Sequence, residues 1–240
     1  MESAISSVEA AKETLFKHGF LDRKDPTVGD GIQEIEKKGF ESFFFSEYGL
    51  EFCQQYVLNT HILSIVESFF GNETCILAHG LRYMAYPGHI VCFRKGGPKA
   101  GRRVLAVHLL AKGSRVSYCG GSHEQFLPTT EGRRFLNEIS QSALDEVGCK
   151  CEEKTFPDGG LTIFDARIGF ELKEGYAITF EFATADVIKN GIKTWPKMVL
   201  PSSPELIQKV GDMERDLEKR KFQKIRMNFV FRDPIASTNT

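Results

Sequence analysis

The chain has 240 residues, of which 41% are hydrophobic and 26% charged, and this balance excludes a disordered tail and a bundle of membrane spans. Its 31 basic and 32 acidic residues give a net charge of −1, which argues against a surface that coats nucleic acid. Twenty phenylalanines beside a single tryptophan predict a deep apolar interior or a large apolar surface.

The amino-terminal third is predicted to be helical. Ser6-Ser-Val-Glu9 is typical of a capping box and predicts a helix that ends near His18. Asp25–Gly31, with its Pro, Gly and Asp residues, predicts a loop. Apolar residues at three- and four-residue spacings then predict one long helix from about Ser46 to Phe70, which Gly71 ends.

From Cys75 onward the hydrophobic pattern changes to short segments that are rich in β-forming residues and mostly bounded by Gly or Pro. These segments predict six strands, at Cys75–Met84, His89–Phe93, Val104–Ala111, Arg115–Cys119, Gly160–Phe164 and Tyr176–Ala183. A helix at about Glu131–Val147 interrupts them. Ser202-Ser-Pro-Glu205 predicts a last helix to about Lys219, and Phe222–Phe231 alternates as the last strand. This order favours a β-sandwich or jelly roll buttressed by helices.

The cysteines and the amino terminus indicate the compartment. The six cysteines are scattered through apolar segments, at positions 53, 75, 92, 119, 149 and 151. A chain of this length needs no disulfide framework, so we expect reduced thiols in a cytoplasmic protein. Cys149-Lys-Cys151 is too short for a usual pair of zinc ligands. The first fifteen residues lack the pattern of a secretory signal, and no apolar window is long enough for a membrane span.

Three segments follow one another in a recognisable order. They are Tyr86-Pro-Gly-His-Ile-Val-Cys-Phe-Arg-Lys-Gly96, then Val104–Ala111 with the turn Gly120-Gly-Ser-His123, and then Gly159–Phe170. Together they resemble phytanoyl-CoA-dioxygenase-like enzymes, which are non-haem Fe(II)/2-oxoglutarate oxygenases. The first segment resembles the strand with the first iron ligands, and the last resembles the segment that normally ends in the distal histidine. The resemblance covers about residues 81–183.

This resemblance implies a mainly β fold with flanking helices, a double-stranded β-helix of the jelly-roll, cupin-like kind. We expect a single dioxygenase-like domain over residues 1–240. It would have a helical amino-terminal part at residues 1–72, the β-helix core at 73–185, and a carboxyl-terminal helix and strand at 200–233.

The positions that match the iron ligands hold unsuitable residues. Such enzymes need two histidines and one carboxylate, with three iron positions left open for 2-oxoglutarate and oxygen. The family's His-x-Asp falls on Arg94 and Gly96, of which the first has no free lone pair and the second no side chain. The distal histidine falls on Phe170, or on Gly169 if the register shifts by one. The arginine that binds 2-oxoglutarate is missing from Tyr176–Phe182. We therefore expect no metal and no cofactor in this chain.

Other residues could carry chemistry. Three histidines on predicted strands could be a displaced ligand set or hydrogen-bonded core residues: His79, His89 and His108. Asp165 could act as an acid or base, or pair with Arg167. His123 could serve a site at the barrel mouth or order its own loop.

Two clusters of basic residues remain. Arg94–Arg103 is a glycine-rich cationic loop that could hold an anion such as a phosphate, although it lacks the Gly-Lys-Ser/Thr ending of a phosphate loop. The alternative is a solvated loop. Glu214–Lys221 mixes both signs of charge and is typical of an exposed helix end. We expect neither nucleic acid nor membrane as a partner.

The resemblance implies a function. Fungal meroterpenoid pathways contain heterodimeric oxygenases in which one subunit keeps the iron triad and its relative does not. This chain resembles the second kind: a non-catalytic accessory subunit whose triad-bearing partner holds Fe(II) and 2-oxoglutarate. Phe43, Phe44 and Phe45 are the candidate partner contact, with a buried core segment as the alternative.

Two other functions stay open. The first is a cofactor-independent isomerase or cyclase that uses His108 or Asp165 as acid or base. The second is a protein that binds a small molecule on the same fold.

Overall fold

A computed structural model describes residues 7–40, 43–133, 136–190 and 197–233. Helix α1 (Val8–His18) follows Ser7, whose hydroxyl accepts a hydrogen bond from the Ala10 N–H. Ser6 of the predicted capping box lies outside the described residues. The loop predicted at Asp25–Gly31 is wrong, because the chain forms α2 (Pro26–Lys38) there. Asp25 caps this helix by accepting the Thr27 N–H at 3.2 Å, and Asp-Pro starts helices as readily as it marks turns.

The long helix predicted at Ser46–Phe70 is in fact two helices, α3 (Glu47–Tyr56) and α4 (Thr60–Phe70). Asn59 begins the second by accepting the Ile62 N–H at 3.1 Å. The apolar spacing continues across the break because both helices bury one face in the same core. Periodicity alone therefore could not locate the break.

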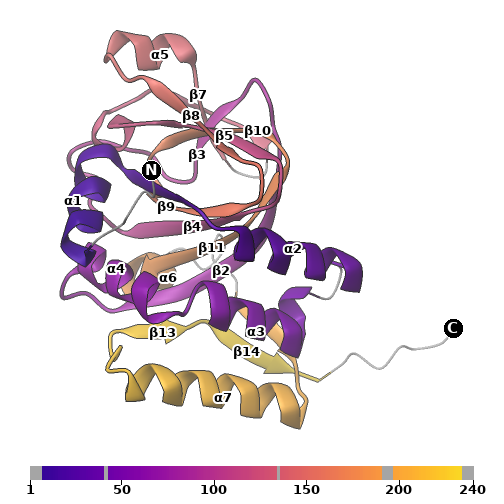
Figure 1. Ribbon diagram of the computed structural model, residues 1–240. Coiled ribbons are helices and arrows are strands. Elements are labelled where there is room, and N and C mark those ends of the chain that lie inside the picture. The colour runs from indigo at the N-terminus through magenta and orange to yellow at the C-terminus, as the bar shows by residue number, and fades with distance from the viewer. Residues whose placement is uncertain (1–6, 41–42, 134–135, 191–196, 234–240) are drawn as a thin grey trace, which may run out of the picture.

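Twelve strands of the described residues form two six-stranded sheets (Figure 1). The first sheet contains, in order, β1 (Phe20–Lys24), β9 (Gly160–Asp165), β4 (Val104–Leu110), β11 (Tyr176–Thr184), β2 (Cys75–Met84) and β13 (Ile225–Met227). The second contains β6 (Thr129–Glu131), β7 (Asn137–Ile139), β3 (Ile90–Cys92), β10 (Gly169–Glu174), β5 (Ser114–Cys119) and β8 (Cys151–Phe156).

The core of the two sheets is a double-stranded β-helix, so the predicted fold class is confirmed. Four antiparallel neighbours of the first sheet, β9-β4-β11-β2, face four of the second, β3-β10-β5-β8. The six strands predicted between Cys75 and Ala183 are all present. The helix predicted at Glu131–Val147 is wrong over most of its length, because the chain there makes β6, β7 and only the short α5 (Gln141–Glu146).

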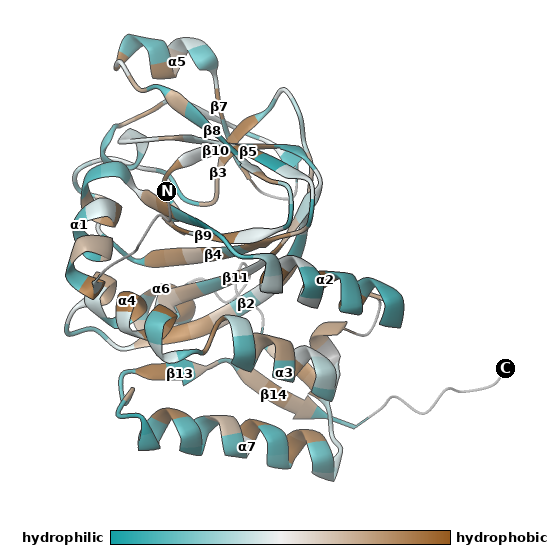
Figure 2. Cartoon of the chain, viewed as in Figure 1, coloured by the Kyte–Doolittle hydropathy of each residue, from teal (hydrophilic) through white to brown (hydrophobic). Residues whose placement is uncertain are grey.

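The carboxyl-terminal segment adds a helix and short strands. Helix α7 (Pro204–Lys219) is confirmed, whereas the last predicted strand is split into β13 and β14 (Phe229–Arg232). Strand β14 pairs in parallel with β12 (Met198–Pro201), and α6 (Ala185–Asn190) follows β11. Figure 2 shows hydrophilic residues along the outer faces of α2 and α7. None of the helices in the described ranges is long and apolar enough to cross a bilayer.

Phenylalanines fill two separate cores. The larger core packs the helices against the outward face of the first sheet, and the second lies between the two sheets. Phe43 belongs to the larger core, where it is 2% exposed and its ring lies 5.4 Å from that of Phe52. Phe44 is half-buried against Phe180. The partner contact proposed for Phe43 is therefore wrong, and the buried-core alternative holds. The side chain of Phe45 lies outside the described part of the chain.

One pair of cysteines departs from the expectation of reduced thiols. Cys119 in β5 and Cys151 in β8 are directly opposite in the antiparallel ladder and form a disulfide. The remaining four cysteines are free and buried: Cys53, Cys75, Cys92 and Cys149. The pairing depends on strand register, which the spacing along the chain does not show.

Candidate functional site

The first two residues of β10, Gly169 and Phe170, are the two candidates for the distal ligand position. Phe170 is paired with Val91 of β3, and both side chains face the interior between the sheets. A Cβ at Gly169 would instead lie 3.3 Å from Ile90 and Ile139, on the outer face of the second sheet. Because side chains alternate along a strand, Phe170 is the residue that occupies the interior position.

Phe170 and five other aromatic rings fill the space between the sheets. We call them the aromatic core: Tyr83, Phe93, His108, Tyr118, Phe164 and Phe170. The Phe170 ring centre lies 5.2 Å from those of Phe93 and His108 and 5.4 Å from that of Phe164. Such spacings are typical of close aromatic packing. The centre of the barrel is therefore occupied by side chains.

His108 is part of this packing. It is fully buried in β4, and its Nδ1 lies 3.0 Å from the Tyr118 hydroxyl, while its Nε2 has no partner. Burial lowers the pKa of His108 to about 3, so the imidazole is neutral at ordinary pH. A base this weak, with no solvent access, is poorly matched to proton transfer near neutral pH.

The burial of His108 predicts a pH effect. Unfolded histidine titrates near pH 6.5, whereas folded His108 takes up a proton only near pH 3, so its stabilising contribution is lost as the pH falls through that window. Between pH 7 and pH 5, the free energy of unfolding of the wild type should fall by about 2 kcal/mol relative to His108→Gln. Urea unfolding of both proteins at both pH values measures this. An equal response of the two proteins would contradict the assigned burial.

The positions that match His-x-Asp offer no metal ligand. The ring of Phe93 lies inside the aromatic core, and Arg94 is half-buried near the Glu181 carboxylate. A Cβ at Gly96 would lie 2.9 Å from the carbonyl oxygen of His123 and 3.0 Å from that of Gln125. A carboxylate side chain at this position would therefore require the backbone to move.

Glu181 is the charged residue at this site that the sequence reasoning missed. It is buried in β11, and burial raises its pKa to about 7, an effect that Arg94 partly offsets. It lies in the stretch where the family resemblance places an arginine for 2-oxoglutarate, so the charge there is reversed. Tyr176–Ala183 is predicted as a strand, but β11 is central and buried on both faces, so the sequence pattern does not show which of its side chains point inward.

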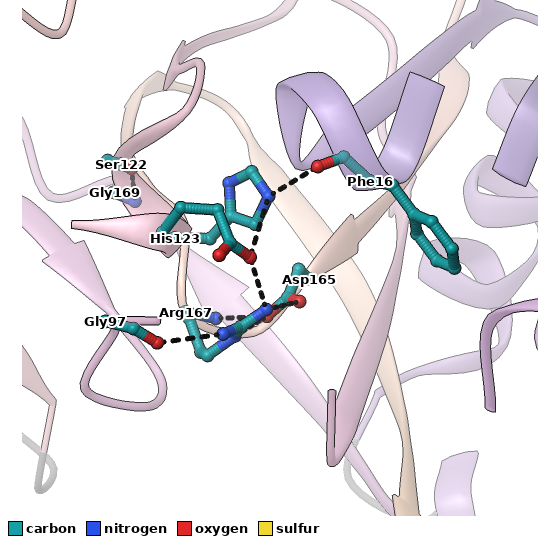
Figure 3. Close-up of polar contacts among 8 residues, drawn as sticks. Phe16, Gly97, Ser122, His123, Asp165, Arg167 and Gly169 are labelled. Atoms are coloured by element: carbon teal, nitrogen blue, oxygen red, sulfur yellow. Dashed lines mark hydrogen bonds and ion pairs between the residues drawn. The ribbon is translucent and has the colours of Figure 1, made fainter. Parts of the chain in front are cut away.

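The Gly120–His123 turn orders the mouth of the barrel (Figure 3). The Ser122 hydroxyl accepts the Gly169 N–H at 2.9 Å, which ties the turn to the start of β10. The buried His123 places its Nε2 3.2 Å from the Phe16 carbonyl oxygen and so joins the turn to α1. The loop-ordering alternative therefore holds for His123.

Asp165 and Arg167 form a buried ion pair beside this turn (Figure 3). The guanidinium donates from Nε to Oδ1 at 2.9 Å and from Nη2 to Oδ2 at 2.7 Å, a bidentate geometry. Nη2 also lies 3.2 Å from the Glu124 carboxylate. With its oxygens held in this way, Asp165 is a structural partner in the β9–β10 turn and is not placed as an acid or base.

The other histidines do not converge on a metal site. His79 lies on β2 opposite Glu181, whereas His89 pairs with Glu138 at 3.3 Å near the far edge of the second sheet. Throughout the described ranges, no three His, Cys, Asp or Glu side chains gather closely enough to hold a metal ion. The residues at this site fit neither iron nor 2-oxoglutarate, on the evidence of Phe170, Gly96 and Glu181.

Solved structures share this fold. The chain is similar to the epimerase SnoN in complex with Fe3+, alpha ketoglutarate and nogalamycin RO, at 11% identity over 74% of this chain and 84% of that one, with a TM-score of 0.50. It also matches AviO1 from Streptomyces viridochromogenes Tue57, at 12% identity over 76% and 97% of the chains and a TM-score of 0.48. EctD from S. alaskensis matches at 9% identity over 77% and 79%, with a TM-score of 0.49.

At 11% identity the similarity to SnoN concerns the fold alone. No protein-family model and no curated protein sequence matches the chain.

Proposed function

We propose that this chain is a non-catalytic accessory subunit of a heterodimeric non-haem iron/2-oxoglutarate-dependent dioxygenase. Its partner would be a homologous chain that keeps the iron triad and binds Fe(II) and 2-oxoglutarate. The accessory subunit would support the partner's fold and help to shape its substrate pocket. The assignment to fungal meroterpenoid biosynthesis, in the cytoplasm, rests on the sequence resemblance alone.

The observation that carries this proposal is the aromatic core at the centre of an otherwise complete β-helix. Phe170 packs on five other rings where a ligand would stand, and Gly96 has no room for a side chain. Because side chains fill the centre of the fold, a function of this chain would depend on its surface. A subunit that works by contact with another chain uses that surface.

The same geometry weakens the isomerase or cyclase alternative. Both residues that it requires are engaged, His108 as a buried neutral imidazole and Asp165 as the partner of Arg167. The alternative of a small-molecule binding protein keeps support from the basic cavity described below.

Co-expression tests the proposal. The chain is produced with a triad-bearing dioxygenase-like chain encoded beside it, with an affinity tag on that partner only. We expect the two to co-purify in a fixed ratio, and the complex to turn over substrate faster than the partner alone. A triad-bearing oxygenase from an unrelated source serves as the control bait. Elution of this chain as a separate monomer, with full activity of the partner alone, would contradict the proposal.

A further inference from the structure

The cationic loop Arg94–Arg103 lines a partly open cavity at the barrel mouth. Its volume is about 230 Å³, and it lies between this loop, the start of β4, the β9–β10 turn and α6. Four of its lining residues are cationic, namely Arg94, Lys95, Arg103 and Arg167. We call this space the basic cavity. Among the described residues that line it, none is acidic.

The acidic groups that balance these cations lie outside the lining of the basic cavity. Arg167 is held by Asp165 and Glu124, and one terminal nitrogen of Arg103 lies 3.1 Å from Asp186. Arg94 has Glu181 near it on the interior side, and burial still lowers its pKa. The lining therefore combines cationic residues with the apolar side chains of Ala100, Val104 and Val187, and its exposed cations are Lys95 and Arg103.

The loop is held in place before any ligand arrives. The Arg94 N–H donates to the Ala166 carbonyl at 2.9 Å and the Gly97 N–H to the His123 carbonyl at 3.0 Å. Gly97 and Gly101 have φ angles of 120° and 71°, which favour glycine and turn the chain so that its basic residues converge. A site fixed in this way loses little freedom when it binds a ligand.

We propose that the basic cavity binds a phosphate group, either as inorganic phosphate or as the phosphate of a small metabolite. The guanidinium of Arg103 and the ammonium of Lys95 suit a tetrahedral dianion with several oxygens, whereas the donors of Arg167 are already engaged by Asp165, Glu124 and Gly97. The net charge of the whole chain is −1 and the basic residues line a cavity of only about 230 Å³, so a small anion fits the site better than a nucleic acid. This inference does not depend on the proposed function.

Calorimetric titration of the full chain in phosphate-free, low-salt buffer tests the site. The probes are inorganic phosphate and glycerol 3-phosphate, with succinate as a carboxylate comparison. We expect saturable one-to-one binding of a phosphate probe and weaker binding of succinate. Tighter binding of inorganic phosphate would identify the free ion as the ligand, and tighter binding of glycerol 3-phosphate a phosphorylated metabolite.

Variants then locate the site. Arg103→Gln and Lys95→Gln should each weaken phosphate binding about tenfold, because each removes a charge-assisted contact. Arg215→Gln is the matched control, since its side chain is 60% exposed beside Asp212, as that of Arg103 is 59% exposed beside Asp186. Binding within twofold of wild type is expected for this control. No saturable binding, an equal loss in the control, or succinate binding as tightly as phosphate would overturn the proposal.

Discussion

Replacing Phe170 by alanine is expected to lower the free energy of unfolding by about 3–5 kcal/mol, which is the usual cost of deleting a large buried ring. The side chain is fully buried and contacts every other ring of the aromatic core. Its removal leaves a cavity whose stiff aromatic walls collapse poorly. Chemical denaturation, read by both fluorescence and circular dichroism, gives the value.

Phe126→Ala is the matched control for this experiment. The same atoms are removed from a side chain that is 85% exposed, so the free energy of unfolding should change by no more than about 0.5 kcal/mol. A loss below about 1 kcal/mol in Phe170→Ala would mean that the centre of the barrel is open, contrary to the packing described here.

Asp165→Asn should destabilise the protein by about 3–5 kcal/mol, because it leaves the buried Arg167 guanidinium without its main counter-charge. The variant Arg167→Gln should lower the free energy of unfolding by a similar amount. The double variant should lose clearly less unfolding free energy than the two single variants together, since neither charge of the pair is then left without the other. Equilibrium unfolding of the three variants forms a double-mutant cycle.

The exposed pair Asp212–Arg215 in α7 provides the comparison. Its side chains are 53% and 60% exposed, so Asp212→Asn should cost at most about 1 kcal/mol. Catalytic involvement of Asp165 would show a different pattern, in which Asp165→Asn removes an activity of the isolated chain without lowering stability.

Much of the fold could be predicted from the sequence because its signals are local. The six strands predicted between Cys75 and Ala183 are mostly bounded by turn residues and are rich in β-forming side chains, and all are found. The wrong predictions arise where one sequence pattern is compatible with two different structures. Asp25-Pro26 suits a turn and a helix start alike, and the apolar spacing across Asn59 suits one helix or two that share a core.

The candidate site was predictable only in part. The loss of the metal ligands can be predicted from the residue types alone, since neither Phe170 nor Gly96 has a side chain that can bind iron. The burial of Glu181 near Arg94 depends on strand pairing, as does the Cys119–Cys151 disulfide, and neither is encoded in spacing along the chain. The convergence of the basic loop around a cavity likewise depends on the turn between β9 and β10.

The central claim, that the ligand positions of this β-helix are filled by residues that bind no metal, is tested most directly by reconstitution of the isolated chain. The chain is incubated with Fe(II) and 2-oxoglutarate without oxygen, desalted, and assayed for iron per chain and then for succinate in air. A triad-bearing oxygenase treated identically is the positive control. We predict less than about a tenth of an iron per chain and no succinate, since no three His, Cys, Asp or Glu side chains of the described residues gather closely enough to form a donor set. One iron per chain together with succinate formation would contradict the account.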